Sequence, residues 1–167
     1  MSTTALPNEY GLDHEEFRPG QYEAIQIAQG MNDNDIFILE APTGSGKTAV
    51  ARAMSSTGVT ALCRTKALQI SNYRDTYGFD ALFGKGNYPC ALNSGLSAGS
   101  CAFADVGMYK CPSLGSCEYM QAKEIAKTSS HRSLNYAYWL TARWPKKDPT
   151  DYVFLDEAHL LSDIVLE

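Results

Sequence analysis

The stretch Glu40-Ala41-Pro42-Thr43-Gly44-Ser45-Gly46-Lys47-Thr48 predicts the fold of this chain. The apolar residues 35–39 before it are typical of a buried strand, and residues 49–54 after it are typical of a helix. A strand, a glycine-rich turn, Lys-Thr and a helix in this order indicate a phosphate-binding P-loop. The glycines let backbone N–H groups close around an anion, because a Cβ would block the approach. Alanine stands at position 41, where the usual motif has its first glycine, so the match is to a variant.

The side chains of this stretch have predicted roles in nucleotide binding. Lys47 is expected to neutralise β- and γ-phosphate charge, and the Thr48 hydroxyl is expected to ligate Mg²⁺. A glycine-rich turn alone is a weak signal, but Lys-Thr at the right offset and the correct flanks argue against a purely structural turn. The residues expected to surround the nucleotide phosphates are Ala41, Pro42, Thr43, Gly44, Ser45, Gly46, Lys47 and Thr48.

Length and composition place the chain among globular proteins, because 167 residues are enough for about one domain with a buried core. No apolar run reaches the roughly 18 residues of a membrane span, and the first residues lack the basic and apolar regions of a signal peptide. We therefore expect a cytoplasmic protein, or a nuclear one in a eukaryote, with no membrane partner and no secretion. In such a reducing compartment, the five cysteines favour metal or cluster ligands over disulfides.

The charge is unevenly distributed along the chain. The net charge of -5 is not that of a typical nucleic-acid-binding protein. Residues 60–150, however, hold 11 of the 14 lysines and arginines and only 6 of the 19 acidic residues. On charge alone, an ordinary solvated surface remains the simpler interpretation.

The region before the P-loop predicts a helix that presents a polar side chain. Residues 1–16 are polar and acidic and predict a loose lead-in, and Phe17-Arg18-Pro19-Gly20-Gln21 then begins a helix that Gly30 would end. The Gln21 amide carries a donor and an acceptor, so it can pair with the edge of adenine. The alternative is a surface glutamine near a helix start.

The region after the P-loop helix repeats the strand–helix pattern. Residues 58–63 predict a second strand, and a helix that ends near Gly78 follows it. This order predicts an α/β fold with a parallel sheet and right-handed crossovers, so binding groups should lie at the carboxyl ends of the strands. Arg64, Thr65 and Lys66 lie at such an end, where they would either contact the phosphates of a nucleic-acid strand or simply begin and cap the helix.

Four cysteines punctuate the irregular region that comes next. This region is rich in Gly, Ser and Ala, and a loop of such length needs something to order it. The cysteine spacing is not the paired pattern of a zinc ribbon, whereas a four-iron–four-sulfur cluster also takes four thiolates. A structural zinc and four unrelated thiols remain alternatives, and Cys63 is expected to be a core residue. The candidate cluster ligands are Cys90, Cys101, Cys111 and Cys117.

The end of the chain predicts the second half of a nucleotide site. After a helix over 118–127, residues 131–140 predict a strand followed by a turn, and 152–155 predict a buried strand. That last strand would deliver Asp156 to the sheet edge to hold Mg²⁺, with Glu157 orienting or deprotonating the attacking water. His159 could relay the nucleotide state to a bound strand or to a second domain.

In these motifs, the chain resembles the N-terminal motor domain of a superfamily-two DNA helicase of the XPD/DinG type, the iron–sulfur helicases. Residues 17–21 resemble the adenine-reading motif, 41–48 motif I, 63–69 motif Ia and 156–159 motif II. Residues 86–90 resemble the segment that delivers the first cluster ligand. Residues 134–137 resemble the strand segment after the cluster, although Tyr136 departs from the histidine often found there, whereas Ala41 is normal in this family.

The resemblance implies a RecA-like P-loop NTPase domain formed by residues 17–84 and 128–167, with an iron–sulfur insertion at 85–127. It implies ATP-driven 5′-to-3′ translocation on single-stranded DNA, with ATP, Mg²⁺ and a 4Fe–4S cluster as ligands. It also implies that the cluster helps to shape the strand-separating surface, and it adds Asn87 and Tyr88 to the candidate DNA contacts.

The sequence ends eight residues after His159, before the family's remaining motifs, its second motor domain and its arginine finger. Because such an arginine stabilises transition-state charge, we expect this chain to bind nucleotide but to hydrolyse it slowly and not to unwind DNA. It would be a fragment, a truncated reading frame or half of a split motor whose second domain is supplied in cis or in trans. A different class remains open: a P-loop interaction module with a zinc-stabilised insertion and no DNA activity.

Overall fold

The structure is a computed structural model that describes residues 5–42, 44–54, 58–103, 107–141 and 148–161. Its strands are β1 (Val59–Cys63), β2 (Asp80–Leu82), β3 (His131–Asn135) and β4 (Tyr152–Leu155). Its α-helices are α1 (Gln21–Gln29), α2 (Lys47–Ala53), α3 (Lys66–Leu68), α4 (Asp75–Tyr77), α5 (Glu118–Thr128) and α6 (Tyr136–Thr141). A π-helical turn, η3 (Gln69–Arg74), joins α3 to α4. The 3₁₀ turns are η1 (Pro7–Tyr10), η4 (Lys85–Asn87), η5 (Ala98–Ser100), η6 (Met108–Lys110), η7 (Leu114–Ser116) and η8 (Ala158–Leu160).

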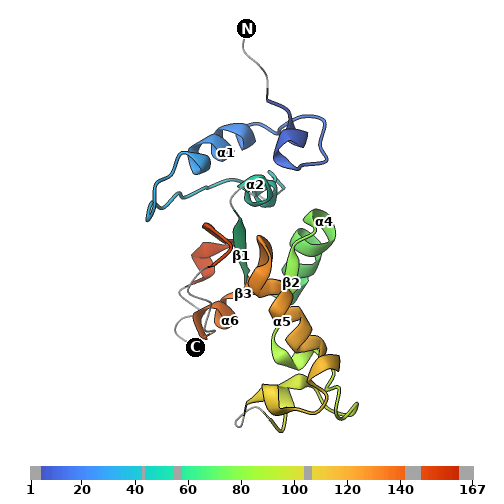
Figure 1. The fold of residues 1–167 in the computed structure, drawn as a ribbon. Helices are drawn as coiled ribbons and strands as arrows, with labels where there is room; N and C mark the ends of the chain where they lie inside the picture. Colours follow the sequence, from blue (N-terminus) through green and yellow to red (C-terminus); the bar gives the residue numbers. More distant parts are fainter. Residues whose placement is uncertain (1–4, 43, 55–57, 104–106, 142–147, 162–167) are drawn as a thin grey trace.

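The four described strands form one parallel sheet in the order β2-β3-β1-β4. In the central strand β1, Val59 pairs with His131 on one side and with Tyr152 on the other. All five residues of β1 are buried, which explains its continuous run of small and apolar side chains. The chain therefore has the predicted mixed α/β fold, a parallel sheet flanked by helices (Figure 1).

Among the described residues, three groups of apolar side chains hold the fold together. One packs α1, α2 and η3 against β1, and a second lies between α1 and α2. The third joins the sheet to α5 and to the cysteine-bearing region. Figure 1 shows α1 and α2 at one end of the sheet and the cysteine-bearing turns beyond α5 at the other.

The predicted helices are confirmed, with their ends close to the expected residues. α1 ends before Gly30, and the segment from α3 to α4 ends before Gly78, whose φ of 69° is the left-handed conformation that closes a helix. α2 and α5 also lie where the periodicity placed them. None of the described helices is long and apolar enough to cross a membrane.

The prediction of a buried strand at residues 35–39 is wrong in this structure. The segment is extended but belongs to none of the described strands. Ile36 and Ile38 are 88% and 84% exposed, while Phe37 and Leu39 pack against the helices. This alternation is what an extended chain produces when only one of its faces is covered.

Three further expectations differ from the structure. Residues 136–141 form helix α6 rather than a turn, because the Asn135 side chain accepts a hydrogen bond from the backbone N–H of Tyr138 at 2.6 Å. β4 lies at the edge of the described sheet, and its residues alternate between half-buried and exposed, so it is not a buried strand. The lead-in is not loose over its described part, since Leu12 is buried against α1 and α2.

Candidate functional site

The predicted P-loop turns sharply before α2. Gly44 and Gly46 have φ values of 81° and 85°, the left-handed conformation that favours glycine, and the Gln21 side chain occupies the space that a Cβ on Gly46 would take. The Lys47 ammonium donates to the carbonyl oxygens of Ala41 (2.7 Å) and Pro42 (3.1 Å), so it lies across the mouth of its own loop. Thr43, a predicted phosphate contact, lies outside the described residues.

Gln21 packs directly on the P-loop backbone. Its side chain is only 5% exposed, and its Nε2 donates to the carbonyl oxygens of Ser45 (3.3 Å) and Gly46 (3.2 Å). Its Oε1 accepts from the backbone N–H of Arg18 at 2.7 Å, and the Arg18 guanidinium donates to the Gly44 carbonyl. The structure thus joins the two predicted nucleotide motifs, while contact of Gln21 with adenine stays a prediction.

Asp156 follows β4, and its backbone N–H, its carbonyl and its carboxylate each form a hydrogen bond. Its backbone N–H donates to the Leu62 carbonyl at 3.0 Å, and its own carbonyl accepts from the Tyr136 hydroxyl at 2.8 Å. Its carboxylate Oδ2 accepts from the Tyr73 hydroxyl at 3.0 Å. Burial raises the pKa of Asp156, and the Tyr73 hydrogen bond and the Lys47 charge partly oppose this shift. The two halves of the predicted site are therefore close enough for Lys47 to act on Asp156.

Tyr73 connects these halves and was not singled out by the sequence. Its side chain is fully buried in η3, where its ring packs edge-on against Phe79 with centroids 5.3 Å apart. The Thr48 side chain lies close enough to this hydroxyl to favour its ionisation, against the other influences on the Tyr73 pKa. Burial and the Asp156 carboxylate raise the pKa of Tyr73, so the phenol keeps its proton as a donor. In the sequence, Tyr73 fits one apolar position of a helical stripe, and only its contact with Asp156 in the fold sets it apart from an ordinary core residue.

Glu157 and His159 are exposed beyond the end of β4. Glu157 has a φ of 56°, a left-handed conformation that is uncommon for a residue other than glycine. Such backbone strain is found preferentially at functional sites. Both side chains are therefore accessible, and their roles stay predictions.

The candidate DNA contacts divide into two kinds. The Thr65 hydroxyl accepts from the backbone N–H of Leu68 at 3.3 Å. Thr65 therefore caps helix α3, which is one of the two roles that the sequence allowed for it. Arg64, Lys66 and Asn87 are exposed, and the Lys66 ammonium donates to Asn87 Oδ1 at 3.0 Å. Two distant segments are therefore brought to one polar surface.

Tyr88 is only half-buried, but both its ring and its hydroxyl have partners. The hydroxyl accepts from the backbone N–H of Phe83 at 3.1 Å, and the ring packs against Tyr119 with centroids 5.6 Å apart. Packing therefore accounts for most of its position, and a DNA contact stays a prediction.

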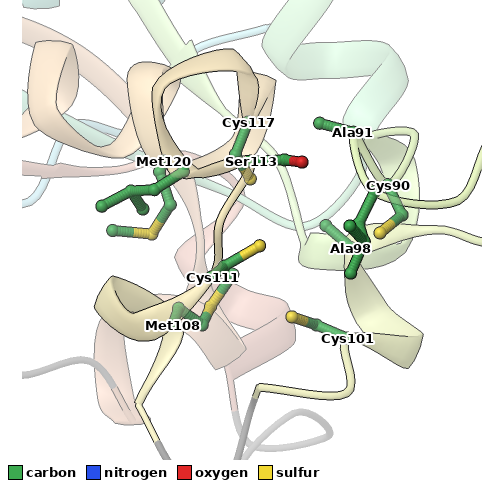
Figure 2. A pocket seen from close by; sticks show the side chains of 11 residues that line it. Cys90, Ala91, Ala98, Cys101, Met108, Cys111, Ser113, Cys117 and Met120 are labelled. Carbon is green, nitrogen blue, oxygen red and sulfur yellow. The ribbon is translucent and has the colours of Figure 1, made fainter.

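The four candidate cluster ligands line a single cavity (Figure 2). Three of them directly follow a 3₁₀ turn: Cys101 after η5, Cys111 after η6 and Cys117 after η7. The sequence carries a sign of this repetition, since Gly-Ser precedes both Cys101 and Cys117. The rest of the lining is almost entirely apolar: Ala91, Leu92, Ala98, Met108, Ser113, Leu114 and Met120.

The spacing of the sulfurs bears on what this cavity can hold. Among the described residues, no three His, Cys, Asp or Glu side chains are gathered closely enough to hold one metal ion. Thiolates around a single zinc must all lie about 2.3 Å from it. In a four-iron cluster each thiolate binds a different iron, so the sulfurs stand further apart. The four thiols line one largely apolar cavity, and whether they hold a four-iron cluster or a single ion stays a prediction.

Cys63 does not belong to this group, because it is fully buried in β1 and burial raises the pKa of its thiol. It is the core residue that was expected.

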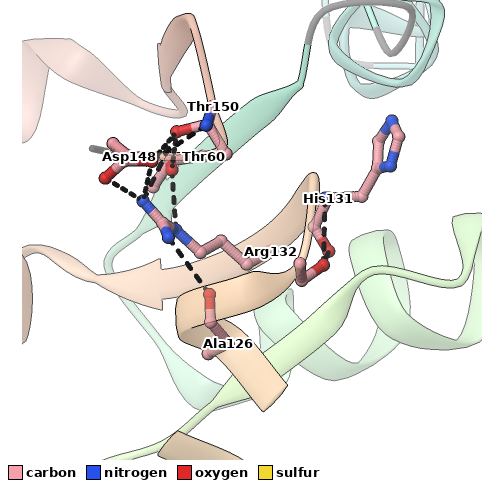
Figure 3. Close-up of polar contacts among 7 residues, drawn as sticks. Thr60, Ala126, His131, Arg132, Asp148 and Thr150 are labelled. Atoms are coloured by element: carbon pink, nitrogen blue, oxygen red, sulfur yellow. Dashed lines mark hydrogen bonds and ion pairs between the residues drawn. The ribbon is translucent and has the colours of Figure 1, made fainter. Parts of the chain in front are cut away.

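A buried arginine network also escaped the sequence analysis (Figure 3). Arg132 in β3 is 0% exposed, and its guanidinium pairs with the Asp148 carboxylate at 2.7 and 2.5 Å. It also donates to the Thr60 hydroxyl at 2.9 Å and to the Ala126 carbonyl at 3.1 Å. The network ties β3 to β1, to the end of α5 and to the segment that enters β4.

No protein-family model, no curated protein and no solved structure matches this chain. The function is therefore argued from the chain's own residues.

Proposed function

We propose that this chain is the ATP-binding motor half of an XPD/DinG-type iron–sulfur DNA helicase, with a RecA-like domain. The observation that carries the proposal is the meeting of the P-loop with Asp156. The Asp156 carboxylate accepts from the Tyr73 hydroxyl, the Thr48 side chain influences the pKa of Tyr73, and the Lys47 charge influences the pKa of Asp156. The parallel sheet, with its polar residues at the carboxyl ends of β1 and β4, is compatible with this fold.

Each side chain at this meeting point would have a distinct task. Lys47 would release the carbonyls of Ala41 and Pro42 and neutralise phosphate charge instead. Thr48 and Asp156 supply the oxygen ligands that Mg²⁺ prefers, and Mg²⁺ sites need only one or two protein groups beside the substrate phosphates. The exposed Glu157 carboxylate would orient the water that attacks the γ-phosphate.

The cysteine cavity supports the iron–sulfur part of the proposal. Cys90, Cys101, Cys111 and Cys117 would hold a 4Fe–4S cluster, whose bound form supplies a rigid centre for the turns around it. Arg64, Lys66 and Asn87 would contact the phosphates of single-stranded DNA from the neighbouring polar surface. A second motor domain, in cis or in trans, would complete the ATP site.

Nucleotide binding tests the central claim. Fluorescent ADP should bind with Mg²⁺ present, and Lys47→Ala should weaken binding at least tenfold because the phosphates lose their counter-charge. Lys110→Ala is the matched control, since Lys110 is an exposed lysine outside the predicted nucleotide motifs, with its ammonium over the Tyr109 ring. Equal binding by the wild type and Lys47→Ala would refute the proposal.

Anaerobic purification tests the cysteine assignment separately. The protein should be brown and contain about four irons per chain, and Cys111→Ser should lower this content, whereas Cys63→Ser should not. A colourless protein with one zinc per chain would instead support the interaction-module alternative.

A further inference from the structure

We propose that Tyr73 is a positioning residue for Mg²⁺: its buried hydroxyl holds the Asp156 carboxylate in place before metal or nucleotide arrives. This inference rests on the proposed function, because it concerns the same site. It adds a residue that lies on neither of the two nucleotide motifs and that would not itself bind the ion.

The first argument is geometric. The Tyr73 hydroxyl donates to Asp156 Oδ2 at 3.0 Å, and both groups are buried. One oxygen of the carboxylate that is proposed to meet the ion is therefore held by a buried phenol. A carboxylate with one oxygen held in this way cannot rotate freely, and metal affinity depends strongly on such partners of the ligands.

The second argument is the backbone that carries Tyr73. η3 is a π-helical turn within an otherwise α-helical segment, a feature found often at functional sites. Gln69 fixes this turn to the sheet: it is buried and donates to the carbonyls of Leu82 (3.2 Å) and Ser133 (3.0 Å). Phe79 packs edge-on against the Tyr73 ring, and His131 packs edge-on against Phe79. Tyr73 is thus held rigidly from its main chain to its ring.

The third argument is the contrast with Tyr136. Its hydroxyl is also buried and also bonds to Asp156, but to the main-chain carbonyl, at 2.8 Å. Removing that hydroxyl deletes one buried hydrogen bond and leaves the carboxylate alone. Tyr73→Phe and Tyr136→Phe are therefore matched variants that differ in which part of Asp156 they release.

The experiment measures fluorescent ADP affinity with Mg²⁺ and with EDTA, and the Mg²⁺ concentration that gives half-maximal binding. Tyr73→Phe should raise that concentration roughly tenfold or more, the usual effect of losing a partner of a metal ligand. It should leave ADP affinity in EDTA within about twofold of the wild type, and Tyr136→Phe should change neither quantity by more than that.

A double-mutant cycle with Asp156→Asn closes the test. If Tyr73 acts through the carboxylate, adding Tyr73→Phe to Asp156→Asn has no further effect on the Mg²⁺ requirement. An equal loss of ADP affinity with and without Mg²⁺, or an unchanged Mg²⁺ requirement, would overturn the inference while leaving the proposed function in place. Failure of the wild type to bind ADP under either condition would instead refute the proposed function and the inference with it.

Discussion

Replacing Asp148 with asparagine removes the counter-charge of a guanidinium that has no access to water. Arg132 is 0% exposed, whereas the Asp148 side chain is 25% exposed. Breaking a buried ion pair by removing one partner costs about 3–5 kcal/mol. Because water can reach the Asp148 side of the pair, we expect the lower end, about 3 kcal/mol. A domain of this size loses about 2–4 °C of Tm per kcal/mol, so the melting temperature should fall by roughly 6–12 °C.

Chemical unfolding in urea, followed by circular dichroism, measures this loss. Glu124→Gln is the control, because it breaks the exposed pair between Glu124 and Lys127, 2.6 Å apart on α5. Exposed pairs contribute about 0–1 kcal/mol, and this contribution is screened by salt. Only the Asp148→Asn loss should therefore persist in 0.5 M NaCl. If Asp148→Asn lost no more than Glu124→Gln, the argument that burial decides the strength of the pair would be refuted.

The same substitution changes the dependence of stability on pH. Burial alone would raise the pKa of Asp148, but hydrogen bonds from Thr150 and Arg132 outweigh it and lower the pKa below its usual range. A carboxyl group with a lowered pKa in the folded state stabilises the protein above the unfolded-state pKa, near 3.9. That contribution is lost as the pH falls through the folded-state value. The difference between wild type and Asp148→Asn should be full at pH 7 and shrink below about pH 4.

Two other substitutions test the backbone and the site. Gly58→Ala should cost more stability than Gly78→Ala. Both glycines have positive φ, but only at Gly58 would the new Cβ clash with a backbone oxygen, that of Pro149. Equal losses of stability in a urea unfolding series would contradict this packing argument. Asp156→Asn should raise the stability of the nucleotide-free protein at pH 7 by about 1 kcal/mol while raising the Mg²⁺ concentration needed for half-maximal ADP binding. Burial raises the pKa of Asp156, so its ionised form is disfavoured in the folded state. The gain in stability of Asp156→Asn should therefore vanish as the pH falls through the folded-state pKa. Thermal melts from pH 7 to pH 4 test this, and a gain in stability that grows in acid would contradict it.

The sequence predicted best where the signal is local. A P-loop helix, a helix that ends at Gly78 and a strand that ends at Asp156 each follow from neighbouring residues, and the structure has the helices and strands there. Residues 35–39 failed because a short apolar run does not say whether both of its faces are covered. Here one face is open, as the exposed Ile36 and Ile38 show.

Long-range polar contacts were the other limit. Tyr73 fits an apolar helical stripe and Arg132 fits a strand, and neither spacing reveals that the first bonds to Asp156 and the second to Asp148. Such pairs join residues far apart in the chain, and their side-chain types are compatible with many other partners. Composition and periodicity carry no information about which partner is chosen, so these contacts emerge only from the assembled fold.

Residues of the predicted motor domain and of the predicted cysteine-bearing insertion pack in one apolar cluster. Cys117 lies immediately before α5, and it packs in the same apolar cluster as Leu62 of β1, Leu82 of β2 and Leu134 of β3. Tyr136, whose hydroxyl holds the Asp156 carbonyl, is a member of that cluster too. Protein interiors are close-packed, so a displacement of Cys117 must be taken up by its neighbours. The cysteine cavity and the Asp156 end of the sheet therefore share one core.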